Sequence, residues 1–274
     1  MSQPNIQDVR NALIAHPGET FDLASRPTRH PNLFDNKQDA RASLLEDAQA
    51  IDELQDRLYA DHKTALLVVL QGIDTSGKSG VIRSVFAQTS PLGVEVKAFK
   101  APSRTEADHD YLRRVHQVVP GVGKIGIFDR SHYEDVLVTK VRELFPGPEI
   151  EARYTQINQF EHYLTANRVH VLKCMLNVSF DRQGERLLDR LEVPEKRWKF
   201  NPSDLDDRAR WSEFMAAYET AVDRCSTEHA PWYVIPADSR TRRNAMVARL
   251  VRGALEDIAP EYPDPGYRPD QFEL

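Results

Sequence analysis

Two short motifs in this sequence carry residue types that handle phosphate groups and a divalent cation. The first is GIDTSGKS at residues 72–79, which matches the phosphate-loop pattern G-x-x-x-x-G-K-[ST]. In such a loop the glycines let backbone N–H groups face phosphate oxygens, Lys78 reaches the outer phosphates, and the Ser79 hydroxyl can bind Mg²⁺. Gly72 and Gly77 are therefore candidate phosphate-binding positions.

Two carboxylates are candidate metal ligands. Asp74 lies inside the loop, where it would repel a phosphate unless a cation lies between them. Its alternative role is to cap the helix that follows the loop. The segment KIGIFD places Asp129 at the end of an apolar strand, where phosphate-loop enzymes hold Mg²⁺, although an Asp there can also be a helix cap. We expect both carboxylates to bind Mg²⁺, with Mn²⁺ as the alternative ion.

The residues after Asp129 extend this second motif. Arg130 has a guanidinium group whose geometry matches phosphate, and its alternative role is a surface ion pair. We expect His132 to be a hydrogen-bonded structural residue rather than a general base. Glu134 lies one helical turn along and either faces a nucleotide or supports the residues that do; the sequence leaves both roles open.

A third cationic region lies later in the chain, where arginines recur every four residues at Arg182, Arg186 and Arg190. On a helix they form one stripe, which is either a solvated, ion-paired face or a lid that lends arginines to a transferred phosphate. The following PEKRWKF places Lys196 and Lys199 beside Trp198. Its flanking prolines predict a shaped loop that could clamp a polyanion, with Trp198 as an alternative hinge anchor.

Alternating strands and helices must position these residues. Apolar runs predict strands at 65–70, 94–99, 124–128, 169–176 and 232–236. Periodic patterns predict helices at 37–61, 77–88, 104–117, 132–144, 150–166, 179–191, 207–227 and 240–258. The order predicts an α/β fold, a doubly wound parallel sheet with helices on both faces. Three arginines that open the last helix are expected on the surface: Arg240, Arg242 and Arg243.

The composition limits the possible partners. Charged residues make up 28% of the chain and hydrophobic residues 41%, which is typical of a globular protein. The net charge of −6 argues against nucleic-acid binding, and no apolar run approaches the ~20 residues of a membrane span. Cys174 and Cys225 match no metal-site spacing and predict reduced, buried thiols. We therefore expect a cytoplasmic protein without a signal peptide.

Several blocks of the sequence resemble the polyphosphate kinase 2 family. They are QGIDTSGKSG, FKAPS with HDYLRRVH, GKIGIFDRSHYEDVLV, RLEVPEKRWKF with DLDDRARW, and STEHAPWYVIPAD, which together span residues 65–240. STEHAPWYVIPAD and SHYEDVLV are most similar to the subgroup that phosphorylates both AMP and ADP. The resemblance implies a phosphate-loop kinase domain over 37–260 with a helical lid at 179–207, between an arm at 1–36 and a tail at 261–274.

The same resemblance implies an activity and a set of roles. The activity is Mg²⁺-dependent, reversible transfer of the terminal phosphoryl group of inorganic polyphosphate to ADP or AMP, by a dimer or tetramer. Asp74 and Asp129 would bind metal, Lys78 and Arg130 would hold the transferred phosphate, and Arg190 would be the lid arginine. Nucleotide or polyphosphate binding is assigned to Gly72, Gly77, Ser79, Lys100, Glu134, Arg186, Lys196 and Lys199. Departures from the family pattern leave the roles of Arg113, Arg182 and Arg186 in substrate binding open.

Two other functions remain open from the residues. An ATP-dependent nucleoside monophosphate kinase of the thymidylate-kinase type shares the phosphate loop and an arginine lid. A nucleotide-binding switch without turnover would share the loop, although a densely cationic lid argues against it. The sequence does not determine whether AMP or ADP is the preferred acceptor or whether adenine is preferred to guanine. It also leaves open the length of polyphosphate used and the favoured direction of transfer.

Overall fold

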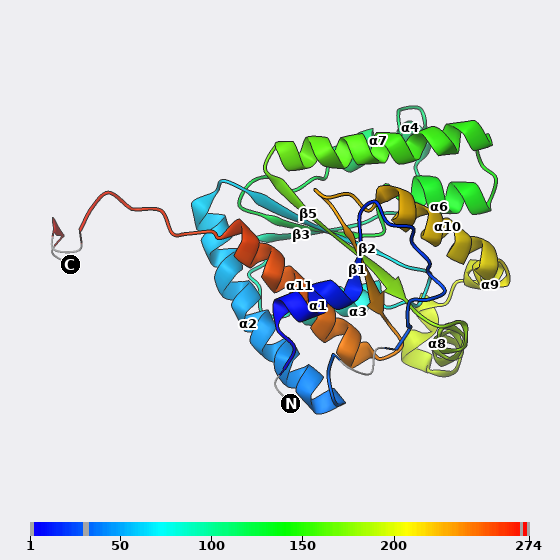
Figure 1. Cartoon of the computed structure of the whole chain (residues 1–274), viewed down its shortest axis with the longest axis horizontal. Helices are drawn as coiled ribbons and strands as arrows, with labels where there is room; N and C mark the ends of the chain where they lie inside the picture. The colour runs from blue at the N-terminus through cyan, green and yellow to red at the C-terminus, as the bar shows by residue number, and fades with distance from the viewer. Residues whose placement is uncertain (1–2, 30–32, 269–270, 273–274) are drawn as a thin grey trace.

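The structure is a computed structural model that describes residues 3–29, 33–268 and 271–272. Within these residues six strands form one sheet in the order β1-β6-β5-β2-β4-β3 (Figure 1). The strands are β1 Ile14–Ala15, β2 Ala65–Gln71, β3 Val94–Ala98, β4 Ile125–Asp129, β5 Val169–Asn177 and β6 Trp232–Pro236. All neighbours pair in parallel except β1, which is antiparallel to β6. The predicted parallel α/β sheet is confirmed.

Helices cover both faces of the sheet because its central strands are apolar on both sides. Every residue of β2, ALLVVLQ, is buried, as expected for the middle of a parallel sheet. One face is covered by α1 Ile6–Leu13, α2 Lys37–Asp61, α3 Lys78–Val85 and α11 Arg240–Ile258. The other is covered by α6 Glu134–Val141, α7 Gly147–Ala166 and α10 Trp211–Cys225 (Figure 1).

The expected lid lies at the carboxyl end of the sheet, beyond the tip of β5 in Figure 1. It consists of α8 Phe180–Glu192, the 3₁₀ helix η1 Pro194–Lys199 and α9 Ser203–Ala209. In parallel sheets ligands bind at this edge, because all the strands deliver their following loops there. The loops after β2 and β4 carry both sequence motifs and therefore meet in front of the lid.

The structure differs from the predicted elements at the predicted helix 104–117 and at strand β1. The predicted helix at 104–117 is wrong as one piece, since two single turns form instead, α4 Arg104–Ala107 and α5 Arg113–His116. The break occurs because the Asp110 carboxylate accepts hydrogen bonds from the N–H groups of Leu112 and Arg113 and starts a new turn. Strand β1 was not expected, because two residues carry no periodic signal.

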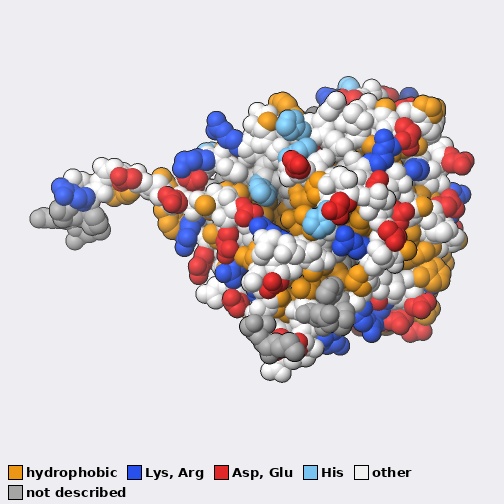
Figure 2. Space-filling view, in the orientation of Figure 1, with side chains coloured by type: hydrophobic (Ala, Val, Ile, Leu, Met, Phe, Trp, Pro, Cys, Tyr) orange, Lys and Arg blue, Asp and Glu red, His pale blue; other side chains and the backbone are white. Residues whose placement is uncertain are grey.

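The remaining expectations concern the surface and the thiols. Cys174 and Cys225 are buried free thiols, and burial raises the pKa of each to about 12. Among the described residues, no helix has both the length and the apolar character needed to cross a bilayer. On the face in Figure 2, acidic and basic side chains are interspersed, and the chain beyond α11 extends away from the body.

Candidate active site

The phosphate loop connects β2 to α3, as its motif requires. Gly72 and Gly77 have φ angles of 146° and 109°, which side chains rarely adopt. A Cβ atom on Gly77 would lie 1.9 Å from Arg243 Nη1. Lys78 is almost buried, and its Nζ donates a hydrogen bond to the Gly72 carbonyl oxygen at 2.6 Å. Gly77 is the N-cap of α3, so the alternative role of Asp74 as the cap is wrong.

We predict that Gly77→Ala distorts the loop. The new methyl group must displace the Arg243 guanidinium at a strained φ, which we expect to lower the free energy of unfolding by about 2 kcal/mol or more. Chemical denaturation measures this loss, and turnover should fall with it. Gly147→Ala is the matched control, because a Cβ there has open space. Equal stability of the two variants would contradict the packing argument.

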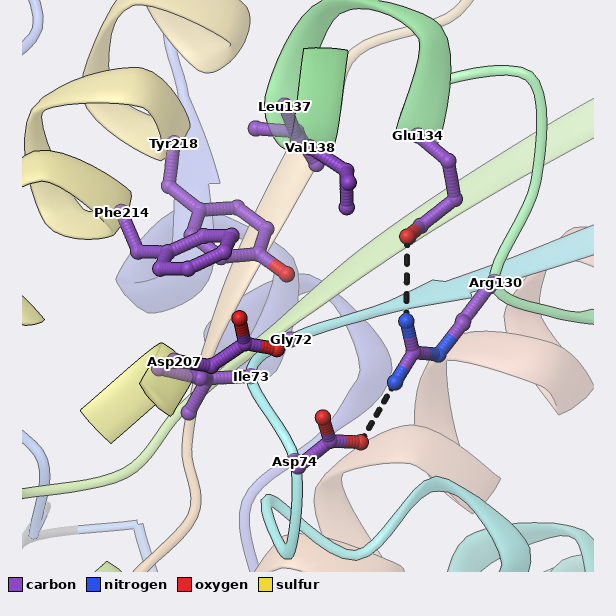
Figure 3. Close-up of a pocket in the computed structure, with 10 residues that line it drawn as sticks. All are labelled: Gly72, Ile73, Asp74, Arg130, Glu134, Leu137, Val138, Asp207, Phe214 and Tyr218. Carbon is purple, nitrogen blue, oxygen red and sulfur yellow. Dashed lines mark hydrogen bonds and ion pairs between the residues drawn. The ribbon is translucent and has the colours of Figure 1, made fainter. Parts of the chain in front are cut away.

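The second motif meets the loop at the end of β4. Asp129 lies beside Leu70 in the parallel ladder, and its Oδ2 accepts a hydrogen bond from Ser79 Oγ at 3.2 Å. Arg130 follows with φ 65° and turns its side chain toward the loop. Its Nη2 lies 2.5 Å from Asp74 Oδ1, and its Nη1 lies 3.1 Å from Glu134 Oε2 (Figure 3). One guanidinium thus joins the loop to the start of α6.

Charges in this cluster set each other's protonation. Burial alone would raise the pKa of Asp74, but the cations of Arg130 and Lys78 outweigh it and lower that pKa. Burial and the nearby Arg130 lower the pKa of Lys78, against the carboxylates of Asp74 and Asp129. Both carboxylates therefore lie within electrostatic reach of one ammonium group.

A pocket opens beside this cluster. Its floor is the loop at Gly72, Ile73 and Asp74, and its polar rim is Arg130, Glu134 and Asp207. The opposite wall is formed by Leu137, Val138, Phe214 and Tyr218 (Figure 3). A site with charge at one end and apolar side chains at the other suits a molecule with a phosphate and an aromatic ring. In this conformation the cavity of about 10 Å³ has room for about one water molecule.

Tyr218 and Phe214 were missed by sequence reasoning. Both lie on the buried face of α10, and their apolar spacing matches that of any core helix. Burial and the charge of Glu134 raise the pKa of Tyr218 well above its ordinary value, so its hydroxyl stays protonated. In Figure 3 that hydroxyl points toward the loop. No sequence signal would have separated Tyr218 from the core residues around it.

Arg190, to which the family resemblance assigns the lid role, lies near the end of α8. Its Nη1 lies 2.8 Å from Asp204 Oδ2 and donates to the Lys199 carbonyl oxygen at 3.1 Å. Its charge adds to those of Arg130 and Lys78, the larger causes, in lowering the pKa of Asp74. Burial and the negative charge of Asp74 raise the pKa of Asp204 to about 6, against Arg190. The lid arginine is thus held by a partner that protonates more easily than an ordinary Asp.

Arg186 does not follow Arg190 toward the open side. Its Nη1 donates to the carbonyl oxygens of Thr75 and Ser76 at 2.9 and 3.0 Å, and its Nη2 donates to those of Ala237 and Asp238. It is buried behind the phosphate loop, and burial together with Arg240 and Arg182 lowers its pKa to about 10. Its contacts support the loop backbone in this structure, and its assignment to nucleotide or polyphosphate binding stays a prediction.

Arg243 supports the same loop, which corrects its expected surface position. The side chain is 2% exposed, and its Nη1 donates to the Ser76 carbonyl oxygen at 3.0 Å. Burial and the nearby Arg186 lower its pKa to about 9. Arg240 remains half-exposed beside Asp189, and Arg242 donates to the carbonyl oxygens of Phe34 and Asp35.

Three predicted lysines lie outside the pocket. Lys100 is exposed just after β3. Lys196 Nζ lies 3.5 Å from Asp189 Oδ2, and Lys199 Nζ lies 4.9 Å from the Trp198 ring centroid. The cluster brought together by the structure is Gly72, Asp74, Gly77, Lys78, Ser79, Asp129, Arg130 and Glu134.

A buried ionic network behind the site was also missed. Lys173, in the middle of β5, donates to Glu161 Oε2 at 2.6 Å, to the Tyr133 hydroxyl at 2.9 Å and to the Cys225 carbonyl oxygen at 2.7 Å. His132 Nε2 lies 3.2 Å from Glu161 Oε1 and is buried, so its expected structural role is confirmed. The network anchors the turn between Arg130 and Glu134.

The Asp135 carboxyl group, next to Glu134, is expected to make the free energy of unfolding depend on pH. Burial raises its pKa from 3.8 to about 6, against the opposing charges of Arg153 and Arg114. The folded protein therefore holds this proton more tightly than the unfolded chain, and stability falls as the pH rises from about 4 to 6. We expect Asp135→Asn to raise the free energy of unfolding by about 1 kcal/mol at pH 8, after allowance for partial exposure, and to change little at pH 4. Denaturation at both pH values measures this; an equal effect at each would contradict it.

The residues of the site suit Mg²⁺. Within the described ranges, no three His, Cys, Asp or Glu side chains form a cluster that could hold a metal ion. The available donors are hard oxygen atoms, the carboxylates of Asp74 and Asp129 and the hydroxyl of Ser79. Mg²⁺ characteristically binds one or two carboxylates and completes its shell with water and substrate phosphates. The donor set therefore fits this ion.

Comparison with known proteins agrees with this site. A model of the family described as polyphosphate kinase 2 matches residues 35–263. An AMP/ADP-polyphosphate phosphotransferase of Meiothermus ruber is 46% identical, over 84% of this chain and 86% of that protein. An ADP-polyphosphate phosphotransferase of Rhodopseudomonas palustris is 36% identical over 90% of each. The crystal structure of polyphosphate kinase 2 from Arthrobacter aurescens TC1 has a TM-score of 0.93 and 36% identity, covering 99% of this chain and 96% of that one. This likeness confirms the expected phosphate-loop kinase fold.

Proposed function

Because this chain belongs to the polyphosphate kinase 2 family, we propose that it transfers the terminal phosphoryl group of inorganic polyphosphate to ADP and AMP. The observation that carries the proposal is the cluster at the carboxyl end of the sheet. There Lys78, Arg130 and two carboxylates meet between a phosphate loop and an arginine-bearing lid. The chain is accordingly an enzyme, a phosphotransferase.

The reaction needs alignment and charge neutralisation more than covalent help. A terminal phosphate oxygen of the nucleotide attacks the last phosphorus of polyphosphate, the bond to the next bridging oxygen breaks, and the shortened chain leaves. The attacking oxygen is ionised at neutral pH, so the step requires no general base. Lys78, Arg130 and Arg190 would stabilise charge on the transferred group. For this, Arg190 must leave Asp204 and turn toward the loop.

The metal remains part of the proposal. Asp129, Ser79 and Asp74 would hold Mg²⁺, with Mn²⁺ as the alternative, and the ion would supply neutralisation of phosphate charge. In this structure the Asp74 carboxylate is paired with Arg130, so that pair must loosen before Asp74 can bind a cation. Arg130 would then turn its freed donors to the phosphate.

The pocket in Figure 3 is the proposed nucleoside site. Phe214 and Tyr218 would pack against the base, while Glu134, on the polar rim, pairs with Arg130. Its small volume requires α9, α10 or their side chains to move when a nucleotide enters. Apolar packing discriminates weakly between purines, so we propose that guanine nucleotides are also accepted.

Two further features belong to the proposal. We propose a homo-oligomer, as the family resemblance implies. The cytoplasmic location stays a prediction, consistent with two buried free thiols.

The phosphate donor provides the test of function. Purified protein and Mg²⁺ are incubated separately with AMP, ADP, GMP and GDP, with either long-chain polyphosphate or ATP as the only donor. The nucleotides are then resolved by chromatography. We expect ADP and ATP to form without added ATP. Phosphorylation of AMP by ATP alone, with none by polyphosphate, would instead indicate a nucleoside monophosphate kinase. Nucleotide binding without either reaction would indicate a switch.

A further inference from the structure

Strand β3 is the least covered strand of the sheet. Strands of a parallel sheet are normally covered on both faces, yet Glu95, Val96, Lys97 and Ala98 are all exposed. Val96 is a large apolar residue with 55% of its surface exposed. The sheet order places β3 at one end, with β4 as its neighbour. Among the described residues, no strand pairs with its other side, which is therefore an open edge.

The hydrogen bonds at the two ends of β3 show which backbone groups face this edge. The N–H of Ile125 donates to the Gly93 carbonyl oxygen at 2.8 Å, and the N–H of Phe99 donates to the Asp129 carbonyl oxygen at 3.0 Å. In a parallel strand both polar groups of a residue point to the same side, and sides alternate along the chain. Odd-numbered residues thus face β4, and Val94, Val96 and Ala98 direct their N–H and C=O groups outward.

We propose that β3 pairs in antiparallel register with β3 of a second copy of this chain, about a twofold axis at Val96. In this register Val96 exchanges two hydrogen bonds with its own counterpart, and Val94 does so with Ala98 of the other copy. About six backbone hydrogen bonds would form. The exposed Val96 side chains would bury each other at the axis, and the two sheets would become continuous.

The side chains of β3 are self-complementary in this register. Glu95 lies directly opposite Lys97 of the other copy, and Lys97 opposite Glu95, at non-hydrogen-bonded positions where side chains approach most closely. In the described part of its own chain, Glu95 makes a long ion pair, with its Oε1 3.9 Å from Lys124 Nζ. Charges on an edge strand commonly prevent pairing, but this arrangement opposes unlike charges and favours one register. A two-residue slip would lose both pairs.

The strength of the contact is limited by its length. Two strands of this size bury less than the roughly 1,200 Å² of a standard stable interface, so we expect a dimer that dissociates on dilution in the micromolar range. The inference concerns only the edge of the sheet and does not depend on the proposed phosphoryl transfer. It gives an interface to the homo-oligomer of the proposed function, and its failure would leave the proposed phosphoryl transfer intact.

Charge reversal tests the register. Sedimentation velocity over a concentration series is expected to show a dimer for the native chain. For Glu95→Lys we expect a dissociation constant at least tenfold higher, because the new lysine of each copy lies opposite Lys97 of the other. The double reversal Glu95→Lys with Lys97→Glu restores unlike pairs and should restore the dimer. A native chain that stays monomeric overturns the proposal. So does a dimer that Glu95→Lys leaves unchanged, because another surface or the C-terminal tail must then hold it.

Cross-linking tests the axis. Copies of residue 96 would lie about 5.5 Å apart between Cα atoms, within the range that a disulfide spans. Val96→Cys is therefore expected to form a covalent dimer under mild oxidation, since Cys174 and Cys225 are buried and do not compete. Glu95→Cys is the matched control, because its copies would be about 8 Å apart across the axis. Equal cross-linking of both variants, or none by Val96→Cys, overturns the proposed axis.

Discussion

Asp129→Asn is expected to lower kcat about 1,000-fold while the protein stays folded. Asparagine keeps the shape of the side chain and can still accept the hydrogen bond from Ser79 Oγ that is 3.2 Å long in the native site. It removes the negative charge at the carboxyl end of β4, which is the charge proposed to hold Mg²⁺ beside the loop. The loss should therefore appear in catalysis rather than in folding.

The experiment separates these two effects. Initial rates with ADP and polyphosphate are measured over a range of Mg²⁺ concentrations, and thermal denaturation is followed on the same preparations. Asp52→Asn is the matched control, since Asp52 lies on α2, outside the pocket. Turnover of Asp129→Asn within a few-fold of the native rate would remove Asp129 from the mechanism. A large drop in melting temperature would show that the loss is structural.

Arg130→Lys is expected to lower kcat about 100-fold although the positive charge is kept. The guanidinium contacts Asp74 through Nη2 and Glu134 through Nη1, so it bridges the loop and α6 with two separate donors. An ammonium group at the end of a flexible stem cannot hold that fork or bind a phosphate oxygen in two places. The transferred group would therefore lose alignment as well as charge stabilisation.

Stability should change little in this variant. The Arg130 side chain is 31% exposed, and ion pairs of this kind contribute about 1 kcal/mol or less. Arg113→Lys provides the control, because Arg113 is exposed on α5 and lies outside the pocket. Kinetics at saturating nucleotide and polyphosphate distinguish kcat from KM. If Arg130→Lys matched Arg113→Lys in both constants, the bridging guanidinium would have no part in transfer.

Residues close together in the sequence allowed the main features of the site to be predicted. The glycine spacing of the loop, the apolar strand before it and the strand that ends in Asp129 are local patterns with one structural solution. These motifs meet at the carboxyl end of a parallel sheet. The alternation of strands and helices in the sequence predicted that sheet. The family resemblance added the substrates, because phosphate chemistry alone does not distinguish polyphosphate from ATP.

Pairing of residues from distant segments did not follow from these patterns. The sequence spacing predicts one helical stripe of Arg182, Arg186 and Arg190. In the structure, Arg186 and Arg243 both donate to the Ser76 carbonyl oxygen of the phosphate loop, whereas Arg190 pairs with Asp204. Lys173 reads as an ordinary polar residue in a strand, and its burial with Glu161 depends on how α7 packs against β5.

The amino-acid order was sufficient for the phosphate loop, the position of Asp129 at the end of a strand and the parallel sheet, because short-range periodicity and spacing specify strands, helices and the turns between them. The buried arginines, the Tyr218 wall of the pocket and the open edge of β3 depended on three-dimensional packing. Burial and electrostatic environment are properties of neighbours brought together from segments a hundred or more residues apart, and no local pattern encodes them.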